Sequence, residues 1–167
     1  MAKNTKIGIF VGSGSDLPII DAATKILDDF SVSYELNILS AHRSPHEVVA
    51  RVEELEKEGA ELFIASAGMA AHLGGVIAAH TSKPVLGVPL GGGDLSGLDS
   101  LLATVQMPKG IPVATFAIGK SGAINAALFA VQILTVSDEK LRERFVEFRK
   151  NQTKEVIEFN SNNKKSN

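Results

Sequence analysis

The segment SAHRSP, residues 40–45, places an imidazole beside a guanidinium directly after an apolar, β-branched run. The imidazole of His42 changes its protonation near neutral pH and can therefore give or take a proton. The guanidinium of Arg43 can hold a phosphate or a carboxylate through two parallel hydrogen bonds, and Pro45 suits the first turn of a helix. A satisfied loop histidine beside a surface arginine would have the same sequence, so this segment alone leaves a structural interpretation open.

A second candidate, VGSGSDLP at residues 11–18, ends one apolar run and opens a helical pattern. Its backbone N–H groups and two hydroxyls can surround an anion at a helix N-terminus, as in a phosphate site. Alternatively, Ser15 or Asp16 only caps the helix, with Pro18 in its first turn, and the two roles are compatible. The segment is not a dinucleotide-binding fingerprint, because Leu17 stands where the third glycine belongs and the next predicted strand ends without an acidic residue.

Three further segments combine small residues with a titratable group or a glycine run. AGMAAHLGG at residues 67–75 places His72 where glycine and alanine would let a ligand approach the backbone; close packing beside an incidental histidine is the alternative. GGGDLSG at residues 91–97 has the flexibility of a gate, although glycine runs are also ordinary turns. ATFAIGKS at residues 114–121 matches a phosphate-binding P-loop only in part, because its first residue is alanine and an apolar strand follows. Lys120 can still contact an anion near the end of that strand.

Metal and covalent chemistry have little support in the sequence. His42 and His46 are separated by Pro45 and have no further ligand nearby, so a zinc site is disfavoured. His80 follows eight residues after His72 at the end of a helical pattern, where it can interact with the helix dipole. Cysteine is absent and no G-x-S-x-G elbow occurs, so a covalent acyl intermediate is not expected.

These segments follow short apolar runs that alternate with helical patterns. The predicted strands span residues 6–12, 33–39, 61–67, 84–90 and 112–118. The predicted helices span residues 16–30, 45–59, 70–80, 96–105, 121–134 and 137–159. The alternation predicts right-handed crossovers and a three-layer α/β domain with a parallel five-stranded sheet. With strand order 2-1-3-4-5, the first three loops meet at the switch point where such sheets bind ligands, and His42 and His72 arrive there from opposite sides.

Length and composition narrow the classes of function. The 167 residues suit one domain, predicted at residues 1–160, with a polar tail at 161–167 that is expected to be disordered. The net charge of −2 gives no basic surface for nucleic acid or anionic membranes. The absence of cysteine fits a cytoplasmic protein, and neither an export signal nor a membrane span is expected. Apolar residues within 137–159 can cover a neighbouring subunit as readily as the chain's own sheet.

The motifs VGSGSD, SAHRSP, AGMAAHLGG and SLLATVQMPKGIPVATFAIGKSGAINAALFAVQIL, in this order and spacing, resemble the class I 5-(carboxyamino)imidazole ribonucleotide mutases of purine biosynthesis. The likeness runs from about Lys6 to about Glu158. It implies a flavodoxin-like, doubly wound sheet with a C-terminal helical extension, and a homo-octamer. It also implies conversion of 5-(carboxyamino)imidazole ribonucleotide to 4-carboxy-5-aminoimidazole ribonucleotide without a metal or an organic cofactor.

By motif position, the resemblance implies roles for individual residues. His42 would be the catalytic proton shuttle: it protonates the ring carbon, CO2 leaves and is held in a closed pocket, the carbon recaptures it, and the proton returns. Arg43 would contact the phosphate of the substrate. The residues implied to bind the substrate are Gly12, Ser13, Ser15, Asp16, Ser40, Ala41, Arg43, Gly68, Ala70, His72 and Leu73.

Other classes of protein share parts of this pattern. The related class II carboxylases, which use free CO2, tend to have lysine after the catalytic histidine and lack the histidine at position 72, so Arg43 and His72 favour the mutase. Among flavodoxin-like binding modules, a phosphoreceiver would need acidic residues after the first and third strands. An FMN carrier would need aromatic faces, where this chain has one Tyr and no Trp. Gly74, where class I members usually have proline, and the glycine-rich segment 91–97 depart from the family pattern.

Overall fold

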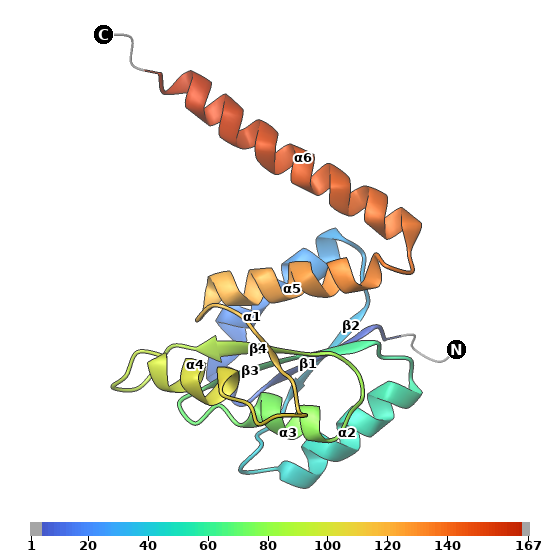
Figure 1. Cartoon of the computed structure of the whole chain (residues 1–167), viewed down its shortest axis with the longest axis vertical. Coiled ribbons are helices and arrows are strands. Elements are labelled where there is room, and N and C mark those ends of the chain that lie inside the picture. Colours follow the sequence, from blue (N-terminus) through green and yellow to red (C-terminus); the bar gives the residue numbers. More distant parts are fainter. Residues whose placement is uncertain (1–4, 165–167) are drawn as a thin grey trace.

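The computed structural model describes residues 5–164. Its strands are β1 (Ile7–Val11), β2 (Tyr34–Ile38), β3 (Leu62–Gly68), β4 (Val85–Leu90) and β5 (Ala114–Thr115). Its helices are the short 3-10 helix η1 (Gly14–Asp16), α1 (Leu17–Asp29), α2 (Pro45–Lys57), α3 (Leu73–Ala79), α4 (Leu98–Val105), α5 (Lys120–Leu134) and α6 (Glu139–Asn162). Figure 1 shows these elements around one sheet, with α6 extending beyond the rest of the chain.

The five strands form one parallel sheet in the order β2-β1-β3-β4-β5. The predicted order, which is that of the flavodoxin-like fold, is therefore confirmed. The inner strands β1 and β4 are buried along their whole length, because parallel strands covered on both faces are continuous apolar runs. Strand β1 has β2 on one side and β3 on the other, so the order in which successive strands join the sheet reverses at β1, and ligands bind in the crevice beyond the carboxyl ends of the strands at such a point.

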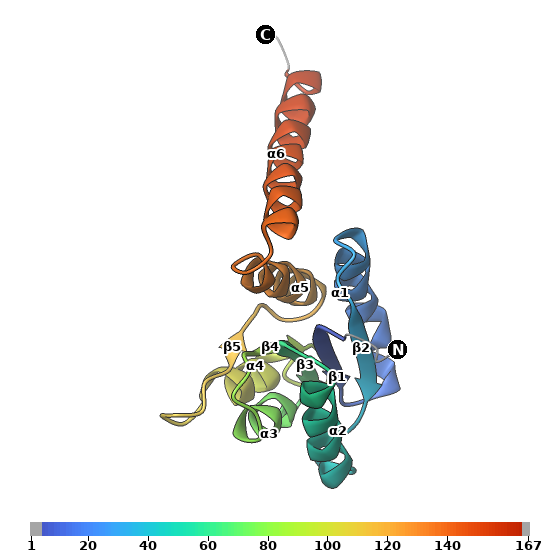
Figure 2. The ribbon, with the colours of Figure 1, turned by 90° about the vertical axis from the view of Figure 1, so that its right-hand side faces the viewer.

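Helices cover both faces of the sheet. Figure 2 shows α1 and α5 on one side and α2, α3 and α4 on the other. The first layer encloses Ile7, Ile9 and Ile64 together with residues of α1 and α5. The second layer encloses Phe10 and Phe63 together with residues of α2 and α3. Because successive residues of a strand point to opposite faces, each short strand supplies side chains to both layers.

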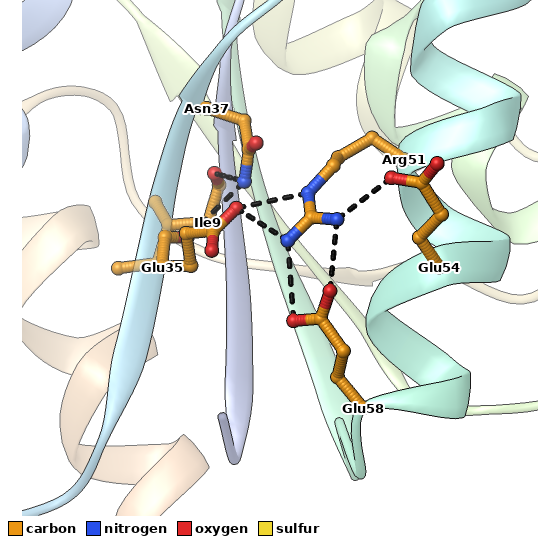
Figure 3. A network of polar contacts seen from close by, with 6 residues as sticks. All are labelled: Ile9, Glu35, Asn37, Arg51, Glu54 and Glu58. Carbon is orange, nitrogen blue, oxygen red and sulfur yellow. Dashed lines mark hydrogen bonds and ion pairs between the residues drawn. The ribbon is translucent and has the colours of Figure 1, made fainter. Parts of the chain in front are cut away.

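Arg51 joins α2 to the edge of the sheet, as Figure 3 shows. Its guanidinium donates to Glu35 on β2 at 2.9 Å, to Glu54 at 2.7 Å and to Glu58 at 3.1 and 3.2 Å. The hydrogen bond to Glu58, followed by those to Glu54 and Glu35, raises the pKa of Arg51 above its ordinary value, against the effect of burial. The network holds α2 against the edge strand β2.

The strand predicted at residues 112–118 is shorter in the structure, where β5 comprises only Ala114–Thr115. The cause lies partly in the neighbouring strand β4. The carbonyl of Pro89 accepts a hydrogen bond from the N–H of Gly119 at 2.8 Å, so the nitrogen of this proline also faces β5. A proline nitrogen has no hydrogen to donate, and Pro112 has none at the other end of the predicted strand. The ladder therefore stops after two residues.

Helix α3 begins later than predicted. The helix expected from residue 70 begins three residues further on, as α3. The N–H groups of Ala71 and His72 donate to the carbonyls of Met69 and Ala70 at 2.9 and 2.8 Å. These bonds span two residues and form tight turns of the γ type in place of a helix. The segment before α3 thereby lies at the carboxyl end of β3 as an irregular loop.

Helix α6 has two unlike halves. In its first half Leu141 is buried, and Phe145 and Phe148 contact Phe30 at the end of α1, with ring centroids 5.8 and 5.4 Å apart. From residue 149 to residue 164, every side chain is exposed. The first half therefore anchors the helix to the domain, and the second half has no cover within the described chain.

The far end of α6 corrects the predicted tail. The helix continues through Asn162, two residues into the range 161–167 in which disorder is expected, because extending an existing helix adds one hydrogen bond for each residue fixed. Residues 165–167 lie outside the described residues. Among the helices of the described chain, none has both the length and the apolar composition needed to cross a bilayer.

Candidate active site

A cleft of about 550 Å³ opens beyond the carboxyl ends of the strands, where the strand order reverses. This volume lies within the range of small-molecule sites. The cleft is lined by all twelve residues expected from the sequence, namely His42 with Gly12, Ser13, Ser15, Asp16, Ser40, Ala41, Arg43, Gly68, Ala70, His72 and Leu73. The structure thus brings these residues together, and their roles toward a substrate remain predictions.

The loop after β1 supplies hydroxyls and a carboxylate. Ser13 accepts hydrogen bonds from the backbone N–H of Ser15 at 3.3 Å and from its hydroxyl at 2.9 Å, and so caps η1. Asp16 stands at the N-cap position of α1, but its side chain makes no capping hydrogen bond. Burial raises the pKa of the Asp16 carboxyl, against hydrogen bonds from Ser15 and Ser13 that lower it. Capping thus involves the Ser13 side chain, and the Asp16 carboxyl is left to line the cleft.

The loop after β2 holds His42 and Arg43 in one tight turn. The hydroxyl of Ser40 accepts hydrogen bonds from the backbone N–H groups of both residues, each at 3.3 Å. Pro45 then begins α2, as predicted. The guanidinium of Arg43 donates to the carbonyl oxygen of Gly12 at 2.9 Å and so joins two loops of the cleft. Within the described chain its side chain has no other hydrogen bond, so its remaining N–H donors are available to an anion.

His42 and His72 meet across the cleft. Nε2 of His42 lies 2.8 Å from Nδ1 of His72, and the rings stand edge to face, with centroids 4.9 Å apart and planes at 80°. The two residues are 30 positions apart in the sequence and come from loops on either side of the switch point, as the strand order predicts. His72 is the N-cap residue of α3, so this helix fixes the position of its backbone.

Five lining residues have no counterpart among the predicted ones: Ala67, Met69, Gly91, Gly92 and Gly93. The φ angle of Met69 is +50°, a left-handed conformation that costs a non-glycine residue about 1–3 kcal/mol. A Cβ atom on Gly93, itself at φ +62°, would lie 3.6 Å from the Met69 side chain, so the two residues join the loops after β3 and β4. The glycine run is visible in the sequence as a flexible segment, but strain at a methionine gives no sequence signal.

A second cleft, of about 570 Å³, lies at the amino ends of the strands beside the turn between α5 and α6. It contains none of the predicted residues and no histidine. Among its charged side chains, Lys6 and Glu61 form an ion pair with each other. The two clefts are of similar size, so volume does not show which of them is the functional site. Their side chains differ: of the two, the switch-point cleft alone contains two imidazoles and a guanidinium with N–H donors that are unpaired within the described chain.

The remaining candidates from the sequence lie elsewhere. His46 and His80 line a groove between α2 and α3, and Lys120 begins α5 without lining the switch-point cleft. Within residues 5–164, no group of three or more His, Asp or Glu side chains is placed to hold a metal ion. The cleft can bind an anion through Arg43 and can move a proton through its imidazoles.

Comparison with known proteins places this chain in a family. The sequence matches the AIR carboxylase family over residues 6–155. The N5-carboxyaminoimidazole ribonucleotide mutase of Haemophilus influenzae is 49% identical over 158 residues, which cover 95% of this chain and 96% of that protein. The mutase of Escherichia coli K12 is 48% identical over 153 residues, which cover 92% and 90%. A crystal structure of Treponema denticola PurE has a TM-score of 0.87 at 25% identity, over 96% of this chain and 99% of that one. The resemblance seen in the motifs is confirmed, and this chain belongs to the AIR carboxylase family.

Proposed function

We propose that this chain is an N5-carboxyaminoimidazole ribonucleotide mutase, which moves a carboxylate from nitrogen to carbon in purine biosynthesis. The activity follows from relatives of that name at 48% and 49% identity over more than nine-tenths of the chain. The residues that favour a mutase over a class II carboxylase, Arg43 and His72, both line the cleft. The observation that carries the assignment of this site is the meeting of His42, His72 and Arg43 in one cleft at the switch point.

In this proposal His42 moves one proton twice. As general acid it protonates the ring carbon of the substrate, the bond between nitrogen and the carboxylate breaks, and the CO2 so formed stays in the cleft. The ring carbon attacks this CO2, and His42 takes back the carbon-bound proton, so the net change is the position of the carboxylate. General acid–base catalysis supplies about 10²–10⁴ in rate, and holding CO2 beside its nucleophile makes the second step effectively unimolecular.

Other residues of the cleft are proposed to hold the ribonucleotide. The open N–H donors of Arg43 suit its phosphate, with charge-assisted hydrogen bonds worth about 1.5–3 kcal/mol each. Ser13 and Ser15 offer hydroxyls, and the Asp16 carboxyl can accept a hydrogen bond from the sugar. The remaining residues form a wall of small or apolar groups that lets the ligand approach the backbone: Gly12, Ser40, Ala41, Gly68, Ala70 and Leu73.

The resemblance also implies an assembly and a location, and both belong to this proposal. A homo-octamer is supported by two apolar surfaces that have no cover within the described chain. The first is an apolar stripe along α4 that begins at Leu95, three residues before the helix. Its side chains are about half exposed or more: Leu95 60%, Leu98 53%, Leu102 49% and Val105 48%. The second is the outer half of α6, with Val156, Ile157 and Phe159. A cytoplasmic location is supported by the absence of cysteine.

Turnover of the purified chain tests the proposal. N5-carboxyaminoimidazole ribonucleotide is compared, in the presence of EDTA, with aminoimidazole ribonucleotide plus bicarbonate. We expect preferential use of the carboxylated substrate. Efficient turnover only from aminoimidazole ribonucleotide and CO2 would move the chain to the carboxylases of its family, and inactivity with both would favour a flavodoxin-like binding module.

A further inference from the structure

The switch-point cleft has a polar half and an apolar half. The loops after β1 and β2 supply its hydroxyl, carboxylate and guanidinium groups and one imidazole, namely Ser13, Ser15, Asp16, Ser40, His42 and Arg43. The loops after β3 and β4 supply small or apolar residues and one further imidazole, namely residues 67–70, His72, Leu73 and the glycines 91–93. The sugar and phosphate of a ribonucleotide suit the polar half. The apolar half suits CO2, because an uncharged molecule without a donor loses little when it leaves water for apolar surroundings.

Met69 is the large apolar residue that this half exposes. It is 61% exposed, whereas Leu73, the other large apolar residue that lines the described cleft, is 2% exposed. The φ angle of Met69, +50°, is one that glycine adopts readily and methionine does not. An exposed side chain gains little from the hydrophobic core, so stability explains neither the methionine nor its conformation. An unfavourable backbone conformation at the wall of a cleft instead favours a role toward the bound ligand.

The Met69 side chain lies against the loop after β4. A Cβ atom on Gly93 would be 3.6 Å from Cγ and 3.7 Å from Sδ of Met69, so the thioether lies beside the backbone of Gly93. The carbonyl of Met69 accepts a hydrogen bond from the N–H of Ala71 at 2.9 Å, which holds its backbone in the tight turn before α3. The unbranched side chain has three rotatable bonds and can adapt to what it covers. Met69 thus connects the two loops of the apolar half and can close over a small ligand there.

We infer that Met69 covers CO2 in the apolar half of the cleft and so decides whether the ring carbon recaptures CO2 or water takes it away. The inference rests on the proposed function, in which CO2 forms inside the cleft. If CO2 stays, the ring carbon bonds to it and His42 takes back the carbon-bound proton. If CO2 escapes, His42 still takes back that proton, the nitrogen takes a proton from water, and aminoimidazole ribonucleotide leaves. The hydroxide that remains joins CO2 as bicarbonate. A site closed to water prevents side reactions of this kind.

The fate of CO2 can be measured directly. The carboxylated substrate is turned over in 14C-bicarbonate, with carbonic anhydrase to equilibrate bicarbonate and CO2, and a sample without enzyme corrects for spontaneous loss of the carboxylate. Each turnover that loses CO2 gives either aminoimidazole ribonucleotide or 14C-labelled product. The sum of these two products, divided by the substrate consumed, is the lost fraction. We expect a lost fraction below about one tenth in wild type.

Three variants at position 69 separate the side chain from the backbone conformation. Met69→Ala removes the cover and keeps the unfavourable φ angle, whereas Met69→Gly removes both. We expect a lost fraction of about one half or more in these two variants, with the rate of substrate consumption within about threefold of wild type. Met69→Leu retains the apolar bulk and should keep the wild-type lost fraction. Ser31→Gly is the matched control, because Ser31 also has a positive φ angle, +52°, but lines the cleft at the amino ends of the strands; its lost fraction should equal that of wild type.

The variants are expected to fold, because Met69 is exposed and its replacement leaves the hydrophobic core intact. The inference is overturned if Met69→Ala keeps the wild-type lost fraction, if Met69→Leu loses as much CO2 as Met69→Ala, or if Ser31→Gly loses more CO2 than wild type. It is also overturned if Met69→Ala changes the oligomeric mass in light scattering, since Met69 would then lie at a contact between copies. A wild type that forms no carboxylated product overturns the proposed function, whereas a wild type that forms this product from labelled CO2 alone overturns only the role of Met69.

Discussion

Two arginines beside the same helix are used in opposite ways. Arg51, within α2, donates to the carboxylates of Glu35, Glu54 and Glu58. Arg43, two residues before α2, donates within the described chain to a single backbone carbonyl, that of Gly12. The N–H donors of the Arg51 guanidinium are paired within the protein, as Figure 3 shows, whereas most N–H donors of the Arg43 guanidinium are available to a ligand.

The difference separates a site that stabilises the fold from a site built for a ligand. Polar groups whose partners all lie in the protein contribute to folding, whereas groups left open at a binding site commonly lower stability in exchange for function. Asp16 resembles Arg43 in this respect, because its carboxyl also lines the cleft and burial there raises its pKa. We therefore expect substitutions in the cleft to change activity, and substitutions in the Arg51 network to change the free energy of unfolding.

The largest effect is expected at His42. In His42→Asn the general acid is lost, so kcat should fall about 10²- to 10⁴-fold or below detection, while the affinity for aminoimidazole ribonucleotide, measured by calorimetry, stays within about threefold. His46→Asn, four residues away but outside the cleft, is the matched control and should retain full activity. A fully active His42→Asn enzyme would refute the proton-shuttle role.

The second-largest effect is expected from loss of the Arg43 guanidinium. Arg43→Ala removes charge-assisted hydrogen bonds to the phosphate, so KM should rise about 10- to 100-fold with a smaller change in kcat, and the free energy of unfolding should stay within about 0.5 kcal/mol of wild type. Arg43→Lys keeps the charge but not the planar fork, and should recover part of the affinity. If Arg43→Ala instead lost stability and kept its KM, the contrast with Arg51 would disappear.

The opposite pattern is expected at Arg51. Arg51→Met leaves three neighbouring carboxylates without their common partner, and the side chains of Arg51, Glu35 and Glu58 are only 21%, 23% and 34% exposed. We expect the free energy of unfolding to fall by about 1–2 kcal/mol, less than for a fully buried pair, with kcat and KM unchanged. Urea unfolding measures the loss. Arg142→Met, which removes an exposed ion pair with Glu139, serves as the control and should change nothing.

The smallest effect concerns Asp16 and depends on pH. Because burial raises the pKa of this carboxyl above 3.8, the folded state binds the proton more tightly, and stability falls as the pH rises from the unfolded-state pKa through the higher folded-state pKa. Asp16→Asn should therefore be slightly more stable than wild type at pH 7, and the difference should narrow as the pH falls toward 3.8. Urea unfolding at several pH values checks this, with the exposed Asp21→Asn as control. A difference that stays constant with pH would contradict this account.

Much of the fold and of the cleft could be predicted because both depend on local patterns. Alternating strands and helices determine the parallel sheet, and ligand loops lie at the carboxyl ends of its strands. The length of β5 could not be predicted in the same way, since Pro89 limits it from a neighbouring strand. At Gly74 the sequence differs from the proline that is usual in the family. A Cβ atom at this position would make only ordinary contacts, of 3.6 Å and more. Gly74 also lies in the first turn of α3, where proline is tolerated.

Two kinds of detail in the cleft could not be predicted from the sequence: contacts that depend on side-chain rotamers, and residues with a left-handed backbone conformation. The 2.8 Å contact of His42 with His72 depends on two rotamers, one on each side of the switch point. The φ angle of Met69 is imposed by its surroundings against its own preference. The position of Gly93 beside it follows from that conformation, so the contribution of this loop to the cleft needed the structure.

The two-residue strand β5 also affects how this chain behaves at high concentration. Exposed edge strands offer unpaired N–H and C=O groups to other chains, which is a route to amyloid-like aggregation, and proteins limit this with very short edge strands and with charged residues. Here one edge of the sheet is only two residues long, and the other, β2, presents Glu35 joined to Arg51. Copies of the chain can therefore meet through their helices while the sheet resists the addition of further strands.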